Sequence, residues 1–144
     1  PEAIDHKLLY SHLKLLCQNK AVDRPSYDFA SHTRHQKTEK LSPKSIIILD
    51  GIFSLYFEKI RQLADVSLFV DVPDDLRFIR RLQRDMTRRA RSQSSVIKQY
   101  LESVRPMHNS YVEPTKNFAD LVIYWEKENP QATKQLVSML LHKL

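Results

Sequence analysis

The sequence predicts an α/β fold in which helices flank a parallel sheet, and two observations lead to that class. Short apolar runs at residues 45–49 (SIIIL), 66–70 and 121–125 are typical of strands buried on both faces. Segments with helical spacing of apolar residues separate these runs, and a short connection between the first two favours a parallel pair with a right-handed crossover. With 144 residues, 42% of them hydrophobic, we expect one domain over residues 1–144.

The N-terminal part is expected to form a helix and then a hairpin. Asp5 can cap a helix that runs to about Asn19 with leucines along one face. A polar, turn-rich segment at 23–25 follows, and alternating residues beyond it predict a β-hairpin within 21–43. Its aromatic and histidine side chains suit recognition of a ligand, although the two aromatic ones could equally cover the edge of a core. These candidates are Tyr27, Phe29 and His32.

The apolar run at 45–49 would deliver Asp50 and Gly51 to the carboxyl end of a strand. Ligands of open α/β sheets bind at such ends. In a phosphotransferase a carboxylate there would hold a water molecule on Mg²⁺, so Asp50 is a candidate catalytic and metal-site residue. An Asp-Gly pair is also an ordinary turn at the end of a strand. A short helix at about 54–63 would return the chain to the second strand.

The most unusual stretch is 77–91, which holds seven arginines, no lysine and one acid, Asp85. Its net charge of +6 equals that of the whole chain, so the remaining residues sum to zero. A guanidinium group can bind two phosphate oxygens at once, and a concentrated arginine helix on a neutral body favours a small phosphorylated ligand. Helical spacing predicts an apolar stripe that packs and an arginine stripe that binds. The first holds Leu76, Ile79, Leu82 and Met86, and the second holds Arg77, Arg81, Arg84 and Arg88.

The C-terminal third is expected to contain two further helices. Ser92 and Ser94 offer a break and a new helix cap, and the helix that follows should end before Pro106. Pro130 opens a closing helix after the third strand.

Composition excludes several classes of protein. The single cysteine, Cys17, rules out a disulfide framework and suits a reducing, cytoplasmic setting. The longest apolar run is far too short to span a membrane. A phosphate-binding loop of the type Gly-x-x-x-x-Gly-Lys-Ser/Thr needs two glycines, and the chain has only Gly51. Because the chain also opens on Pro1, we expect it to be a piece of a longer protein.

A series of short motifs follows one order along the chain, and together they resemble the uridine kinases (uridine-cytidine kinases). The resemblance runs from Pro1 to about Ile123. The motifs are Pro1-x-Ala3-x-Asp5, Pro25-x-Tyr27-x-Phe29-x-x-His32-x-Arg34, Ile48-Leu49-Asp50-Gly51-Ile52, Phe69-Val70-Asp71, Arg80-Arg81-x-x-Arg84-Asp85, Gln99-Tyr100, Arg105-Pro106, Glu113-Pro114-x-Lys116 and Ala119-Asp120.

This resemblance implies a P-loop nucleoside kinase fold, N-terminally incomplete, with a β-hairpin and an arginine-rich helical lid at about 85–115. It implies transfer of the γ-phosphate of ATP, with Mg²⁺, to the 5′-hydroxyl of uridine or cytidine in pyrimidine salvage, and assembly as a homotetramer. By position, the hairpin would hold the base, the lid would hold the sugar, and two lid arginines would face phosphate oxygens. The base contacts would be Tyr27, Phe29 and His32, the sugar contacts Arg81, Arg91 and Gln99, and the phosphate contacts Arg84 and Arg89.

The chain also departs from this family. Arg88-Arg89-Ala90-Arg91 stands where Glu-Arg-Gly-Arg is usual, Asp50 replaces a Glu, and Tyr124-Trp125-Glu126 replaces Pro-Arg-Gly. The phosphate loop and the catalytic base lie upstream of Pro1 in the family, so we expect this chain alone to be inactive. Two alternatives stay open: a non-catalytic basic module that binds RNA or another polyanion, and a nucleoside monophosphate kinase. Nucleic acid is the less favoured ligand, because the positive charge is confined to one helix.

Overall fold

The computed structural model describes residues 1–28, 33–126 and 130–143. They form two compact units, Pro1–Leu63 and Ala64–Leu144. The predicted α/β class with a small parallel sheet is confirmed, and the prediction of a single domain stays a prediction. Within the described residues, no helix combines the length and the apolar character needed to cross a membrane.

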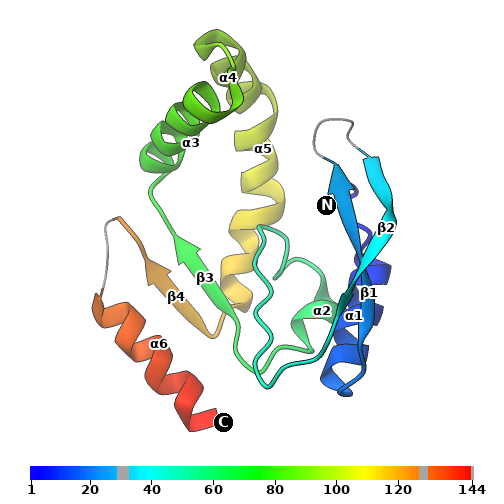
Figure 1. Cartoon of the computed structure of the whole chain (residues 1–144). Helices are drawn as coiled ribbons and strands as arrows, with labels where there is room; N and C mark the ends of the chain where they lie inside the picture. The colour runs from blue at the N-terminus through cyan, green and yellow to red at the C-terminus, as the bar shows by residue number, and fades with distance from the viewer. Residues whose placement is uncertain (29–32, 127–129, 144) are drawn as a thin grey trace. The chain divides into compact units, whose positions relative to one another are not determined.

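The first unit contains helix α1 (His6–Cys17), a β-hairpin and the short helix α2 (Glu58–Arg61) (Figure 1). The Asp5 side chain caps α1 as predicted, because it accepts a hydrogen bond of 3.1 Å from the amide of Leu8. The helix ends two residues earlier than expected. Asn19 then takes a left-handed conformation with φ of 59°, which asparagine tolerates at the end of a helix.

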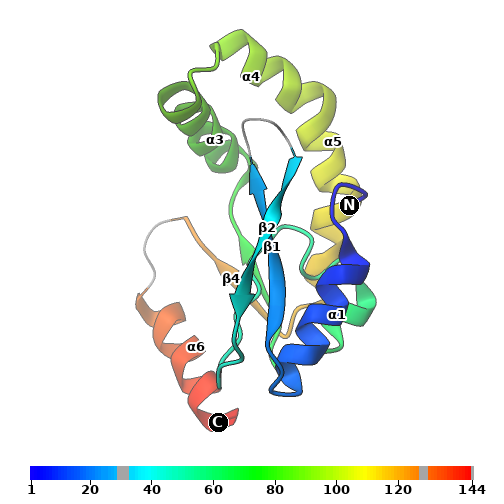
Figure 2. The same cartoon turned by 45° about the vertical axis from the view of Figure 1, so that its right-hand side comes forward.

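The predicted hairpin is present as β1 (Val22–Asp28) paired antiparallel with β2 (Thr33–Leu41) (Figure 2). The segment 23–25 that we expected to be a turn belongs to β1, where Pro25 lies opposite Thr38. The register shifts between Pro25 and Tyr27, which is where a strand accommodates a residue that cannot donate to the ladder. The hairpin therefore begins at Val22, four positions after Gln18, the C-terminal cap of α1.

The prediction of a buried strand at 45–49 is wrong. The structure assigns no strand there, and its apolar side chains are exposed, with Ile48 at 84%. A strand needs a hydrogen-bonded neighbour, and the described strands pair only as β1 with β2 and β3 with β4. The predicted parallel pairing of 45–49 with the next strand is therefore absent as well. Only Glu58–Arg61 of the helix expected at about 54–63 is helical, after a series of turns.

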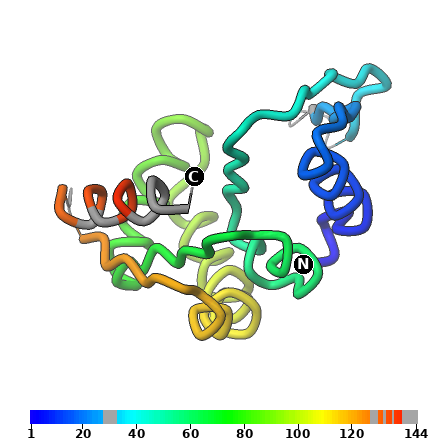
Figure 3. Tube along the Cα trace, turned by 90° about the horizontal axis from the view of Figure 1, so that it is seen from below, coloured from blue at the N-terminus to red at the C-terminus, as the bar shows by residue number. Residues whose placement is uncertain are grey.

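The second unit contains the parallel pair β3 (Leu68–Asp71) and β4 (Leu121–Tyr124), which run side by side in Figures 1 and 3. Ser67 and Asp120 align the starts of the two strands. The Ser67 hydroxyl donates to Oδ2 of Asp120 at 2.6 Å, and the Ser67 amide donates to the same oxygen at 2.7 Å. At the other end, Lys116 pairs with Asp71, and this hydrogen bond raises the pKa of Lys116.

Along the chain, β3 and β4 are separated by α3 (Asp74–Arg89) and a long series of helical turns. The turns comprise α4 (Gln93–Gln99), the π-helix η1 (Tyr100–Val104), α5 (Arg105–Met107), the π-helix η2 (His108–Val112) and the 3₁₀ helix η3 (Glu113–Phe118). Figure 2 shows α4 and α5 joined end to end. The prediction of a helix end before Pro106 is therefore wrong, because the wider π turn before it accommodates a residue without an amide hydrogen. The closing helix α6 (Pro130–Lys143) begins at Pro130 as predicted.

Candidate phosphate-binding site

Helix α3 forms where the sequence predicts it, with Asp74 and Asp75 in its first turn, where the positive end of the helix dipole favours acids. The predicted division of its faces holds only in part, because Leu76 and Leu82 are half-buried and Arg84 and Arg88 are exposed, but the other members of the two stripes do not follow it. Ile79 and Met86 are 46% and 42% exposed, whereas the side chain of Asp85 is completely buried. The helix also packs through the neighbouring face, where the ring centroids of Phe78 and Tyr100 lie 4.6 Å apart.

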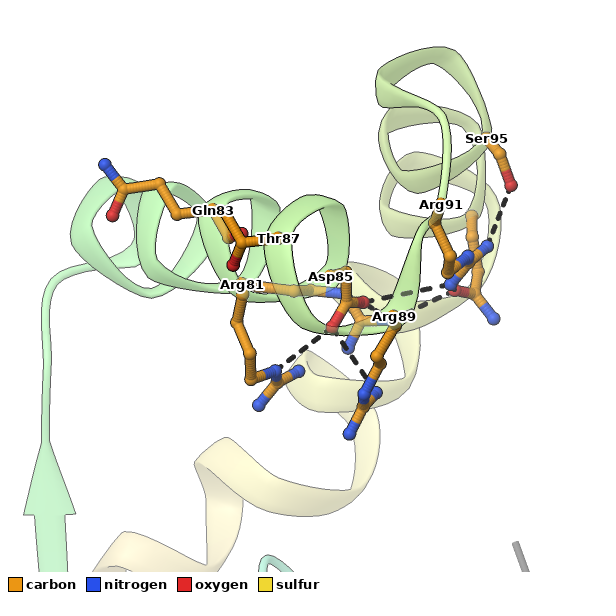
Figure 4. A network of polar contacts seen from close by, with 9 residues as sticks. Arg81, Gln83, Asp85, Thr87, Arg89, Arg91 and Ser95 are labelled. Atoms are coloured by element: carbon orange, nitrogen blue, oxygen red, sulfur yellow. Dashed lines mark hydrogen bonds and ion pairs between the residues drawn. The ribbon is translucent and has the colours of Figure 1, made fainter. Parts of the chain in front are cut away.

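Asp85 is buried because four arginine side chains surround its carboxylate (Figure 4). On Oδ1, the Nε of Arg84 donates at 3.0 Å and the Nη1 of Arg89 lies at 3.3 Å. On Oδ2, the guanidinium nitrogens of Arg81 and Arg91 lie at 3.6 and 3.8 Å. Spacings of four residues place Arg81 and Arg89 one turn before and after Asp85 on the same helix.

Arg91 reaches Asp85 because the chain turns sharply after α3. Ala90 adopts a left-handed conformation with φ of 50° and ψ of 34°, and the amide of Arg91 then donates to the Asp85 carbonyl at 3.2 Å. Ser92 starts the next helix by accepting a hydrogen bond from the Ser95 amide, as the sequence predicts. The turn therefore folds the last arginine back over the acid.

Gln99 lies at the end of the next helix, α4, and its side chain hydrogen-bonds to two of the arginines. Its side-chain oxygen accepts hydrogen bonds from Arg81 at 3.0 Å and from Arg91 at 2.6 Å, and Arg91 also donates to the Ser95 hydroxyl at 2.9 Å. These two arginines are mostly covered, with 23% and 29% of their side chains exposed. Arg84 and Arg89 are about half exposed, at 46% and 55%, so their remaining N–H groups are accessible.

The electrostatics of Asp85 follow from these contacts. Burial by itself would raise the pKa of Asp85, but the hydrogen bond from Arg84 and the charges of Arg81, Arg84 and Arg89 outweigh it and hold the pKa below the ordinary value. Asp85 is therefore ionised at neutral pH. One carboxylate cannot neutralise four guanidinium groups, so the cluster keeps a net positive charge and can attract an anion.

Five of the predicted site residues thus come together in the second unit, namely Arg81, Arg84, Arg89, Arg91 and Gln99. Tyr27 and Asp50 lie in the first unit, Tyr27 being 46% exposed on β1 opposite Arg34 and Asp50 being exposed on the segment that is not a strand. Phe29 and His32 lie outside the described residues. No role was predicted for Asp85, although its spacing of four residues from Arg81 and Arg89 was a usable signal.

The turn at Ala90 gives a prediction about stability. A left-handed conformation costs a residue with a Cβ about 1–2 kcal/mol, and glycine avoids this cost while gaining some freedom in the unfolded chain. We expect Ala90→Gly to raise the free energy of unfolding by about 0.5–1 kcal/mol in urea titrations. A matched Ala→Gly change at Ala119, which has an extended backbone, should lower the stability instead. A loss of stability in Ala90→Gly would contradict the assigned turn.

Comparison with known proteins identifies the family of this chain. The profile of the phosphoribulokinase/uridine kinase family matches residues 1–131. The chain is 49% identical over 144 residues to the uridine kinase of Haemophilus influenzae (strain PittEE), covering 100% of this chain and 68% of that protein. It is 47% identical over 140 residues to the uridine kinase of Lactobacillus helveticus, covering 97% of this chain and 66% of the relative. The chain spans about two thirds of the length of these relatives. It belongs to the phosphoribulokinase/uridine kinase family, whose members are phosphotransferases.

Proposed function

We propose that this chain is the nucleoside-binding and lid part of a uridine kinase. The enzyme would transfer the γ-phosphate of ATP to the 5′-hydroxyl of uridine or cytidine, act in pyrimidine salvage in the cytoplasm, and assemble as a homo-oligomer. The observation that carries the proposal is the arginine cluster around Asp85, in a chain that is 45–49% identical to proteins named uridine kinase. A net positive cluster with free guanidinium N–H groups is suited to the phosphates of ATP.

The roles within the site are assigned by combining the resemblance with the contacts. Arg84 and Arg89 face phosphate oxygens, because they carry the exposed N–H groups of the cluster. Arg81, Arg91 and Gln99 contact the ribose as one hydrogen-bonded unit. Tyr27, Phe29 and His32 hold the pyrimidine from the hairpin.

Asp50 is assigned to Mg²⁺ through a bound water. Among the described residues no group of three or more acids, histidines or cysteines could hold a metal by itself. Mg²⁺ in kinases is bound by one or two carboxylates together with substrate phosphates, so a single exposed acid fits this ion. When bound, the ion would neutralise charge on the phosphates during transfer.

Nucleoside binding tests the function. Calorimetric titration of the 144-residue chain should detect uridine and cytidine but not adenosine, because a site built to hydrogen-bond one base leaves its polar groups unpaired with another. A coupled assay with ATP and uridine should show no turnover by this chain, since it has one glycine and therefore no Gly-x-x-x-x-Gly-Lys-Ser/Thr loop.

The same chain can be tested for polyanion binding with a labelled RNA. If RNA binds with a steep salt dependence and millimolar uridine or UTP does not compete, the chain acts as a basic module and the kinase assignment fails. Equal binding of uridine and adenosine would also contradict the proposal.

A further inference from the structure

Arg84 and Arg89 form one of the two arginine pairs around Asp85, and both of their guanidinium groups lie against the same carboxylate oxygen. Arg84 approaches Oδ1 of Asp85 through Nε at 3.0 Å, and Arg89 approaches it through Nη1 at 3.3 Å. Each guanidinium has five N–H donors in a fixed plane, so most of the donors of both groups remain available. Each side chain is also about half exposed. The two groups therefore present adjacent sets of donors to solvent.

Two guanidinium groups this close would repel each other without the acid between them. Asp85 cannot itself meet a ligand, because its side chain is completely buried. On its other side, Oδ2 makes no hydrogen bond within the described residues, and Arg81 and Arg91 there direct their N–H groups to Gln99. The buried carboxylate thus separates a covered pair of arginines from an accessible pair.

We propose that Asp85 is a positioning residue that sets Arg84 and Arg89 side by side so that together they bind two neighbouring groups of a polyphosphate. This inference rests on the proposed function, since it assumes that the accessible pair binds the phosphates of ATP. It predicts that the Asp85 carboxylate strengthens the binding of an anion, although its negative charge alone would weaken it. Removing a negative charge should strengthen the binding of an anion, whereas loss of the positioning group should weaken it.

Calorimetric titration with inorganic tripolyphosphate at low ionic strength separates these effects. We expect Asp85→Asn to weaken binding at least tenfold. The matched control is Asp74→Asn, which removes the same charge from an exposed acid on the same helix, paired with Arg77, and should bind within about twofold of the wild type. Ser67→Ala loses the hydrogen bond from the Ser67 hydroxyl to Asp120 at the start of the two strands. It controls for lowered stability and should bind tripolyphosphate as the wild type does.

The outcomes are distinct. Tighter or unchanged binding by Asp85→Asn overturns the positioning role and leaves the proposed function standing, whereas a wild-type chain that does not bind tripolyphosphate overturns both. If Asp85→Asn does not fold, as judged by circular dichroism, Asp85→Glu provides the test. It keeps the charge but moves the carboxylate by one methylene, and we expect at least threefold weaker binding. Wild-type affinity in this variant would overturn the proposal.

Discussion

Replacing Arg84 and Arg89 together by glutamine should weaken the binding of tripolyphosphate by about 100-fold. Each of these side chains can donate charge-assisted hydrogen bonds worth about 1.5–3 kcal/mol, and about 1.4 kcal/mol corresponds to a tenfold change in affinity. Both are about half exposed and keep N–H groups that Asp85 does not use. Calorimetric titration at low ionic strength measures the change in Kd.

Two further variants separate hydrogen bonding from charge. The double lysine variant keeps both charges but loses the planar forks, and we expect an intermediate loss of about tenfold. Arg88→Gln removes one charge from the same turn at an exposed residue that lies outside the Asp85 cluster, and it should change Kd by less than about threefold. If the lysine variant binds as tightly as the wild type, the cluster recognises charge alone and the assignment of paired guanidinium contacts is wrong.

The elements that the sequence predicted well are those specified by local patterns. Asp5 and Ser92 are capping residues whose side chains act on amides three residues away. The acids before the arginine helix and its helical spacing are equally local, so α3 could be predicted closely at both ends. The alternation in the hairpin predicted β1 and β2 for the same reason.

The segment at 45–49 shows the limit of this approach. An apolar run indicates that a segment is suited to burial, but burial needs covering helices and paired strands supplied by other parts of the chain. The described strands β3 and β4 pair with each other, and Ile48 stays exposed. The identity of Asp50 as a candidate acid came from the same run, so its predicted place at a strand end fails with the strand.

The centre of the site was missed for a different reason. In the net charge of 77–91, Asp85 counts only as one negative charge against seven arginines. Its importance depends on burial and on the return of Arg91 through a left-handed residue at Ala90, a conformation that alanine disfavours. The contacts of Arg81 and Arg89 could have been found from their spacing of four residues, whereas that of Arg91 could not.

Asp85→Asn should lower the free energy of unfolding at pH 7 by about 1–3 kcal/mol. Removing one partner from a buried ion pair typically costs about 3–5 kcal/mol. We expect a smaller loss here because Arg84 and Arg89 are about half exposed and can turn toward water once the carboxylate is gone. Asp74→Asn is the control, since its carboxylate is 65% exposed and pairs with a single arginine. It should cost less than about 1 kcal/mol.

The pH dependence of the difference in unfolding free energy between the wild type and Asp85→Asn tests whether the ionised carboxylate causes that difference. Because the arginines hold the pKa of Asp85 below its value in the unfolded chain, near 3.9, the folded state binds fewer protons and the contribution is complete above that value. It is lost as the pH falls through the folded pKa. Urea titrations at pH 7, 5, 4 and 3 should therefore show the wild type and Asp85→Asn differing fully at pH 7 and 5 and converging below pH 4. A difference that stays constant down to pH 3 would show that Asp85 contributes through packing or neutral hydrogen bonds, and the four arginines would then need another counter-charge.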